Sequence, residues 1–152
     1  MTKATLPAGF LRLVVGYDGS APADHALDAA IRLLHGRAGR IDVVYVAHLS
    51  SLVMLSADAI AEMEVDFEEI EKDLRAEVTE RLRGCGVAWE FERYQGGIAD
   101  ELIAVAATIC DARPCDTVAI VVGSSSHAAR RAVGSVAVSL ARRSPVPLVI
   151  VP

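Results

Sequence analysis

The chain has 152 residues, of which 53% are hydrophobic and only 5% aromatic, and its formal net charge is −5. This length predicts one domain with a sizeable core, and the low aromatic content predicts that aliphatic side chains fill it. The acidic balance argues against a general nucleic-acid binder, which needs a basic face. Three cysteines do not make a disulfide framework, and no apolar run reaches the length of a signal peptide or membrane span. We therefore expect a cytoplasmic protein.

The first half of the chain predicts a strand, a helix, a second strand and a long helix. Residues 11–17 (LRLVVGY) are an aliphatic run ended by the turn sequence DGSAP, which is typical of a buried strand. Residues 23–36 repeat apolar side chains at helical spacing, and Pro22 suits the first turn of that helix. A second strand is predicted at 40–48 and a long helix at 57–84.

The long helix is amphipathic and has a marked charge asymmetry. Its apolar residues follow helical spacing at Ile60, Met63, Phe67, Ile70, Leu74 and Val78. Its acids concentrate early (Asp58, Glu62, Glu64, Asp66, Glu68, Glu69) and its bases late (Arg75, Arg81, Arg83). This polarity complements the helix dipole, so we interpret the charges as a solvated face rather than a site.

The second half of the chain continues the alternation to its end. A strand is predicted at 87–94, a helix at 96–112, a strand at 116–123, a helix at 135–144 and a last strand at 146–152. Strands that alternate with helices predict a parallel sheet with helices on both faces. In such sheets ligands bind beyond the carboxyl ends of the strands, where the winding reverses.

Two short polar stretches are predicted to meet at that position. They are YDGS after the first strand and GSSS after the fourth, provided that these two strands are central neighbours. The sequence contains no G-x-x-x-x-G-K-[ST] and no G-x-G-x-x-G at the first helix, and its two lysines are Lys3 and Lys72. We therefore do not predict nucleotide hydrolysis of the P-loop type.

Each candidate residue of this crevice has a structural alternative. Gly134 and Ser135 begin a helix whose first amides could hold a phosphate, or they form a plain N-cap. Gly123 suits a turn as well as a binding position, and Asp18 could cap the first helix or accept a ribose hydroxyl. No nucleophile elbow and no metal-ligand spacing occurs in the sequence, so we predict no catalytic residue and no metal site.

The segments LRLVVGYDGSAPADHALDAA, VVYVAH, GGIADELIAVA and DTVAIVVGSSS with VGSVAVSLARRSPVPLVIVP resemble the universal stress protein family. The resemblance covers residues 10–152 as a single domain, preceded by a predicted flexible arm at 1–9. It implies an α/β fold, Rossmann-like and similar to adenine nucleotide alpha hydrolases. In that fold a five-stranded parallel sheet of order 3-2-1-4-5 is flanked by four helices. It also implies a homodimer that pairs the last strands, Val146 to Val151, edge to edge.

Nucleotide-binding members of that family carry the motif G-x2-G-x9-G-[ST], and this chain has an altered copy of it. Gly123 matches the first glycine, and Gly134 with Ser135 matches the closing pair. Ser126 stands in place of the second glycine, and the following spacer, residues 127–133, has seven residues instead of nine.

The resemblance further implies that the adenosine half of the site is retained. Asp18 matches the aspartate near the ribose and adenine, and Val46 matches the residue whose backbone contacts the adenine ring. Val136 would follow Ser135 at the phosphates.

The function expected from this resemblance is a small stress-response regulatory module that binds ATP, ADP or AMP. Magnesium could accompany the nucleotide. The alternative is a member that binds no nucleotide and acts through protein–protein contacts. We expect no enzymatic activity, although slow ATP hydrolysis is left open as an alternative. The expected partners are a second copy and an unknown regulatory protein, with no nucleic acid and no membrane.

Overall fold

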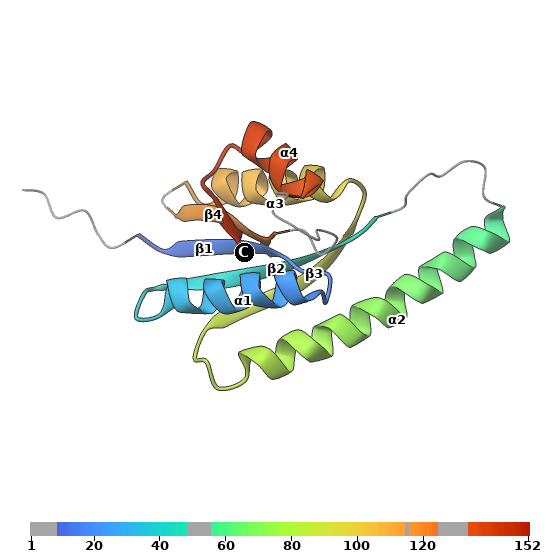
Figure 1. Ribbon diagram of the computed structural model, residues 1–152, viewed down its shortest axis with the longest axis horizontal. Coiled ribbons are helices and arrows are strands. Elements are labelled where there is room, and N and C mark those ends of the chain that lie inside the picture. Colours follow the sequence, from blue (N-terminus) through green and yellow to red (C-terminus); the bar gives the residue numbers. More distant parts are fainter. Residues whose placement is uncertain (1–8, 49–55, 115, 125–133) are drawn as a thin grey trace, which may run out of the picture.

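The computed structural model describes residues 9–48, 56–114, 116–124 and 134–152, in which strands and helices alternate (Figure 1). The predicted ranges agree with the observed ones within two residues at each end. The elements are β1 (Leu11–Gly16), α1 (Ala21–Leu34), β2 (Gly39–Ala47), α2 (Ala57–Leu82), β3 (Ala88–Gln95), α3 (Ile98–Ala112), β4 (Thr117–Gly123), α4 (Ser135–Arg143) and β5 (Leu148–Val151).

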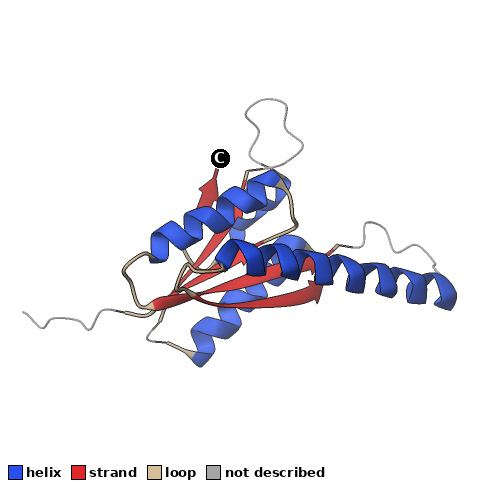
Figure 2. Cartoon of the chain, turned by 90° about the horizontal axis from the view of Figure 1, so that it is seen from below, coloured by secondary structure: helices blue, strands red, loops and turns tan. Residues whose placement is uncertain are grey.

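The five strands form one parallel sheet of order β3-β2-β1-β4-β5, which confirms the predicted fold. β1 lies at the centre, and its Val15 pairs with Val43 of β2 and Val121 of β4. Helices α1 and α2 cover one face of the sheet and α3 and α4 the other (Figures 1 and 2). Because the winding reverses between β1 and β4, their carboxyl ends form the switch point where such sheets bind ligands.

Each face of the sheet has its own apolar core. Alternate side chains of β1 point to opposite faces, so Leu13 and Val15 pack with α1 and Val14 packs with α3. All three are almost fully buried. Burial on both faces is why the central strands are continuous aliphatic runs rather than alternating ones.

Helix α1 has clear local signals at both ends, and Pro22 lies in its first turn as the sequence predicted. The hydroxyl of Ser20, its N-cap, accepts the amide of Ala23 at 3.3 Å. The helix ends at His35, and the next residue, Gly36, has φ +70°, a backbone conformation that favours glycine.

Only part of α2 packs on the body of the protein. Leu74, Val78 and Leu82 are buried, whereas Ile60 and Ile70 are exposed. Figures 1 and 2 both show the first half of α2 extending beyond the sheet. The helix is longer than the layer that it covers, and so its apolar stripe continues into solvent.

At least three of the α2 charges that we interpreted as a solvated face contact other elements, namely Glu64, Arg75 and Arg81. Arg81 forms ion pairs with Asp24 and Asp28 of α1. Arg93 of β3 forms ion pairs with Glu64 and Glu71. Arg75 stacks over the ring of Phe91, with its guanidinium carbon 4.8 Å from the ring centroid. The contacts with Arg93 and Phe91 attach the middle of α2 to the edge strand β3.

Several predicted features lie outside the described residues. They are the N-terminal arm apart from Gly9, the nucleotide-motif residue Ser126, and the spacer at 127–133. None of the helices in the described ranges is long and apolar enough to cross a membrane.

Candidate functional site

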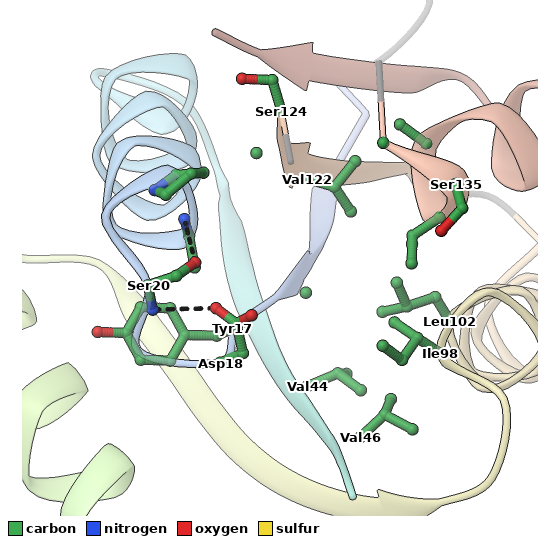
Figure 3. A pocket seen from close by; sticks show the side chains of 17 residues that line it. Tyr17, Asp18, Ser20, Val44, Val46, Ile98, Leu102, Val122, Ser124 and Ser135 are labelled. Atoms are coloured by element: carbon green, nitrogen blue, oxygen red, sulfur yellow. Dashed lines mark hydrogen bonds between the residues drawn. The ribbon is translucent and has the colours of Figure 1, made fainter. Parts of the chain in front are cut away.

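A pocket of about 320 Å³ lies beyond the carboxyl ends of β1 and β4 (Figure 3). The stretches after these two strands do meet there, as the sequence predicted. Six of the seven predicted site residues line this pocket, and Ser126 is the one outside the described residues. Those that line it are Asp18, Val46, Gly123, Gly134, Ser135 and Val136.

One wall of the pocket is the turn that joins β1 to α1. The Oδ1 atom of Asp18 accepts the backbone amide of Ser20 at 3.0 Å, and Gly19 between them has φ +78°. Ser20 is the N-cap of α1, so the alternative that Asp18 caps this helix is wrong. Asp18 instead holds the capping turn in shape, and its carboxylate is exposed beside the pocket.

Tyr17 anchors this turn to both helices on its face of the sheet. Its hydroxyl donates a hydrogen bond to Oδ1 of Asp24 at 2.7 Å and lies 3.3 Å from Oε2 of Glu77 on α2. Burial, and then the bond to Asp24, raises the pKa of Tyr17 above its usual value of 10.0. The hydroxyl therefore stays protonated, and remains a donor, above the pH at which an ordinary tyrosine ionises.

The opposite wall is the N-terminus of α4. Gly134 is the N-cap and makes no side-chain capping bond, and the helix begins at Ser135. Gly134 therefore forms the plain N-cap that was the structural alternative, and the hydroxyl of Ser135 does not cap the helix. The first amides of a helix have no partner inside it, so those of Ser135 and Val136 are available to an anion at this end of the pocket.

Gly123, at the end of β4, is a glycine for a packing reason. A Cβ atom at this position would lie 2.2 Å from the carbonyl oxygen of Pro22 in the first turn of α1. Its φ is not in the left-handed region. The structure thus shows why no side chain fits there, whether or not a ligand binds.

Apart from Val46 and Val136, the apolar part of the pocket was not predicted. Side chains from β2, β4 and α3 build it, namely Val44, Val46, Val122, Ile98 and Leu102. Figure 3 shows them between Asp18 and Ser20 on one side and Ser135 on the other. In the sequence these residues look like ordinary core positions, and only the register of the strands places them at the pocket.

Two further polar residues, Ser20 and Ser124, also line the pocket. Both belong to the stretches that the sequence placed at the crevice, YDGS and GSSS. Within the described ranges, no group of three or more His, Cys, Asp or Glu side chains is arranged to hold a metal ion.

The sequence pattern of the universal stress protein family matches residues 9–152. The chain belongs to the universal stress protein family. The resemblance stated from the residue pattern is therefore confirmed. Among proteins of curated function, none matches this universal stress protein significantly.

Solved structures of other universal stress proteins share the fold. A universal stress protein UspA from Lactobacillus plantarum is 17% identical, with a TM-score of 0.76 over 95% of this chain and 99% of its own. A universal stress protein solved in complex with cAMP is 24% identical (TM-score 0.63; 95% and 98% covered). A family protein from Arabidopsis thaliana with AMP bound is 12% identical (TM-score 0.60; 93% and 90% covered).

Proposed function

We propose that this universal stress protein is a non-enzymatic cytoplasmic regulatory module that binds an adenine nucleotide in the pocket between β1 and β4. The observation that carries the proposal is the division of this pocket into three parts. An exposed carboxylate, Asp18, lies on one side, an apolar lining in the middle, and an uncapped helix N-terminus on the other side. In a nucleotide the ribose joins the purine ring to the phosphate, and the three parts of the pocket suit a ribose hydroxyl, the purine ring and the phosphate, respectively.

The adenosine half would use Asp18 and the apolar lining. Because the amide of Ser20 already fixes Oδ1 of Asp18, the other carboxylate oxygen can accept a hydrogen bond from a ribose hydroxyl. The purine ring would lie against Val44 and Val46, with Ile98 and Leu102 facing it from α3. Apolar walls with a few fixed polar groups are typical of small-molecule sites.

The phosphate half would use the beginning of α4. The amides of Ser135 and Val136 and the positive end of the helix dipole favour an anion there. Ser124 and Ser135 both line the pocket, and their hydroxyls would add two donors for a phosphate. Ser126 would contribute its backbone amide, as its place in the family motif implies.

The expected nucleotide is ATP, ADP or AMP, with AMP or ADP favoured. The loop between Gly123 and Gly134 is two residues shorter than in the family motif and lacks one glycine, so it offers fewer phosphate donors. Two relatives in the fold were solved with AMP and with cAMP, which supports an adenosine monophosphate as a ligand to be tested here. Magnesium would accompany a di- or triphosphate.

We further propose that the protein is a homodimer that pairs its last strands. β5 lies at the edge of the sheet, beside β4 alone. Its four residues are apolar and only partly buried. An apolar strand with a free edge invites pairing with another strand, and a second copy satisfies it by symmetry.

The deciding experiment measures nucleotide directly. Freshly purified protein is denatured, the released nucleotides are separated by anion exchange, and the emptied protein is titrated with ATP, ADP, AMP and cAMP by calorimetry. We expect a stoichiometric adenine nucleotide or saturable binding, which Asp18→Asn weakens about tenfold or more because the ribose loses a charged acceptor. Asn retains an acceptor for the Ser20 amide, so the turn is kept.

Asp111→Asn is the matched control, because Asp111 is also an exposed aspartate but lies in the last turn of α3, away from the pocket. The affinity of the Asp111→Asn variant for the nucleotide should equal that of the wild type. A protein that releases no nucleotide and binds none at millimolar concentration, on the order of a typical upper limit for cellular metabolites, would overturn the proposal.

A further inference from the structure

The first half of α2, residues 57–73, presents an apolar stripe that nothing in the described chain covers fully. We call these residues the α2 arm. Ile60 is 53% exposed and Ile70 is 42% exposed, although both continue the helix face that buries Leu74 and Val78 farther along. Figure 1 shows the α2 arm extending away from the sheet, whereas the second half of the helix lies beside α1.

The spacing of this stripe is that of a helix–helix seam. Ile60, Met63, Phe67, Ile70 and Leu74 are separated alternately by three and four residues. A repeat of 3.5 residues keeps one line of side chains facing a second helix, as in coiled coils. The geometry of the stripe therefore fits a helical partner better than a strand or a loop.

The stripe has acidic residues along both sides. On one side, acidic side chains recur at intervals of four and three residues and form a first row. On the other side, a second row of acidic side chains faces β3. The first row consists of Glu62, Asp66, Glu69 and Asp73. Lys72 is the single basic residue of the α2 arm.

Most of these carboxylates form no ion pair with another side chain of the described ranges. In the second row, Glu64 and Glu71 form ion pairs with Arg93, as described above. Within the described residues, no ion pair involves the first row. An apolar seam with a row of unpaired carboxylates along one side is complementary to an amphipathic helix that carries Lys or Arg side chains on the matching side.

We propose that the α2 arm is a docking surface for a basic amphipathic helix of another protein. A second copy of the α2 arm is a poor occupant, because its own acidic rows would face these rows and repel them. An anionic membrane surface is disfavoured for the same reason. Leu74 is buried and Phe67 packs partly against the core, so the accessible part of the seam runs from Ile60 to Ile70 and is about one and a half heptads long. The contact therefore belongs with small, transient interfaces.

The test uses the full chain and a model peptide. A fluorescein-labelled peptide of roughly 18 residues, built from Leu and Lys with leucines at the seam spacing, is titrated with the protein, and its anisotropy is recorded. A scrambled peptide of the same composition and a peptide with Glu in place of Lys are measured beside it. We expect a Kd on the order of 10 µM for the seam peptide and no saturable binding for the other two.

The variants separate the seam from general acidity. Ile60→Ala/Ile70→Ala should weaken peptide binding about tenfold or more, since it removes apolar contact area. Alanine is the best helix former, so a loss of binding cannot be assigned to a melted helix. The matched control is Val65→Ala, because Val65 is 56% exposed but lies on another face of α2, and it should bind as the wild type does.

A second pair of variants tests the charge. Glu62→Gln/Glu69→Gln should lower affinity several-fold and reduce its dependence on salt, because two of the flanking charges are lost. Glu80→Gln/Asp111→Asn removes two exposed carboxylates elsewhere and should leave binding unchanged.

Three outcomes would overturn the proposal. The scrambled peptide could bind as well as the seam peptide, which would show attraction by charge alone. The Ile60→Ala/Ile70→Ala variant could bind like the wild type. Finally, sedimentation could show wild-type oligomers that this double variant dissociates, which would assign the surface to a second copy.

Discussion

The backbone of Pro22 lies directly against Gly123, at the point where α1 begins beside the end of β4. The space is so narrow that a Cβ atom on Gly123 would come within 2.2 Å of the carbonyl oxygen of Pro22 and 2.4 Å of its carbonyl carbon. A glycine that belongs by position to a nucleotide motif is therefore also required for the packing of the first helix on the sheet.

We predict that Gly123→Ala lowers the free energy of unfolding by about 1 to 3 kcal/mol, because backbone atoms of Pro22 must move to admit the methyl group. Urea denaturation measures the change. Gly97→Ala is the comparison, because the nearest atom to its added Cβ is an oxygen of the flexible Asp100 side chain. The loss in free energy of unfolding should be clearly smaller for Gly97→Ala than for Gly123→Ala. Equal stability of Gly123→Ala and wild type would contradict this account of the glycine.

Asp42 on β2 holds two arginines together on the face of the sheet that carries α3. Arg12 donates to its two carboxylate oxygens, from Nε at 3.0 Å and from NH2 at 2.8 Å. Nε of Arg40 lies 3.1 Å from Oδ1 without forming a hydrogen bond. Asp42 is only 8% exposed, and it is the one buried charged residue in the described chain.

We predict that Asp42→Ala destabilises the fold by about 2 to 3 kcal/mol, because two partly buried guanidinium groups lose their shared counter-charge. The control is Glu80→Ala, whose ion pair with Arg83 is 71% exposed on both sides. Such surface pairs contribute between zero and about 1 kcal/mol. If the two variants unfold at the same urea concentration, the Asp42 contacts do not stabilise the fold.

The raised pKa values of two tyrosines predict how the free energy of unfolding changes at alkaline pH. Burial and the hydrogen bond to Asp24 raise the pKa of Tyr17, and burial with a bond to Glu92 raises that of Tyr94 to about 12. In the unfolded chain these groups lose their protons near pH 10, while the folded chain still holds them. Unfolding therefore releases protons in this window, and stability must fall as the pH rises from about 10 to 12.

Tyr17→Phe removes one of these groups and should make this fall shallower. At neutral pH the variant should lose about 1 kcal/mol, from the missing hydrogen bond to Asp24. Urea denaturation at a series of pH values between 8 and 12 compares the slopes, a range that runs from below the usual tyrosine pKa to the raised pKa of Tyr94, about 12. Gly97→Ala, which keeps all tyrosines, should retain the wild-type slope. Parallel curves for Tyr17→Phe and wild type would show that Tyr17 titrates normally.

The outer edge of β5 gives a prediction about the proposed dimer. Val151 accepts the amide of Ser124 and Pro147 accepts that of Ile120, so the odd-numbered residues of this segment bond to β4. In a parallel ladder the amides of the residues between them, Leu148 and Ile150, point away from β4.

If the last strands pair in a dimer, the amides of Leu148 and Ile150 should exchange their hydrogens slowly at high protein concentration. On dilution below the dissociation constant their exchange should accelerate, while that of Val149 changes little. Hydrogen exchange followed by NMR, with sedimentation in parallel, measures both. A dimer in which these two amides exchange freely would have another interface.

Local patterns in the sequence determined the nine elements of this protein, because aliphatic runs and helical spacing record which side chains must be buried. The same patterns placed YDGS and GSSS at one crevice, since parallel strands bring their carboxyl ends to the same edge of the sheet. The strand order and the nucleotide residues came from the resemblance to the universal stress protein family.

Only the tertiary structure decided what each face of an element meets. Spacing made Ile60 and Leu74 equivalent, but the sheet ends between them, and so one is exposed and the other buried. Asp18 was the sequence candidate for the cap of the first helix, but the hydrogen-bond geometry gives that role to Ser20. Likewise, Leu102 lies at the pocket because α3 packs against strands that are far from it in the sequence. Periodicity shows that one face of a helix or strand is apolar, but it does not encode which surface covers that face.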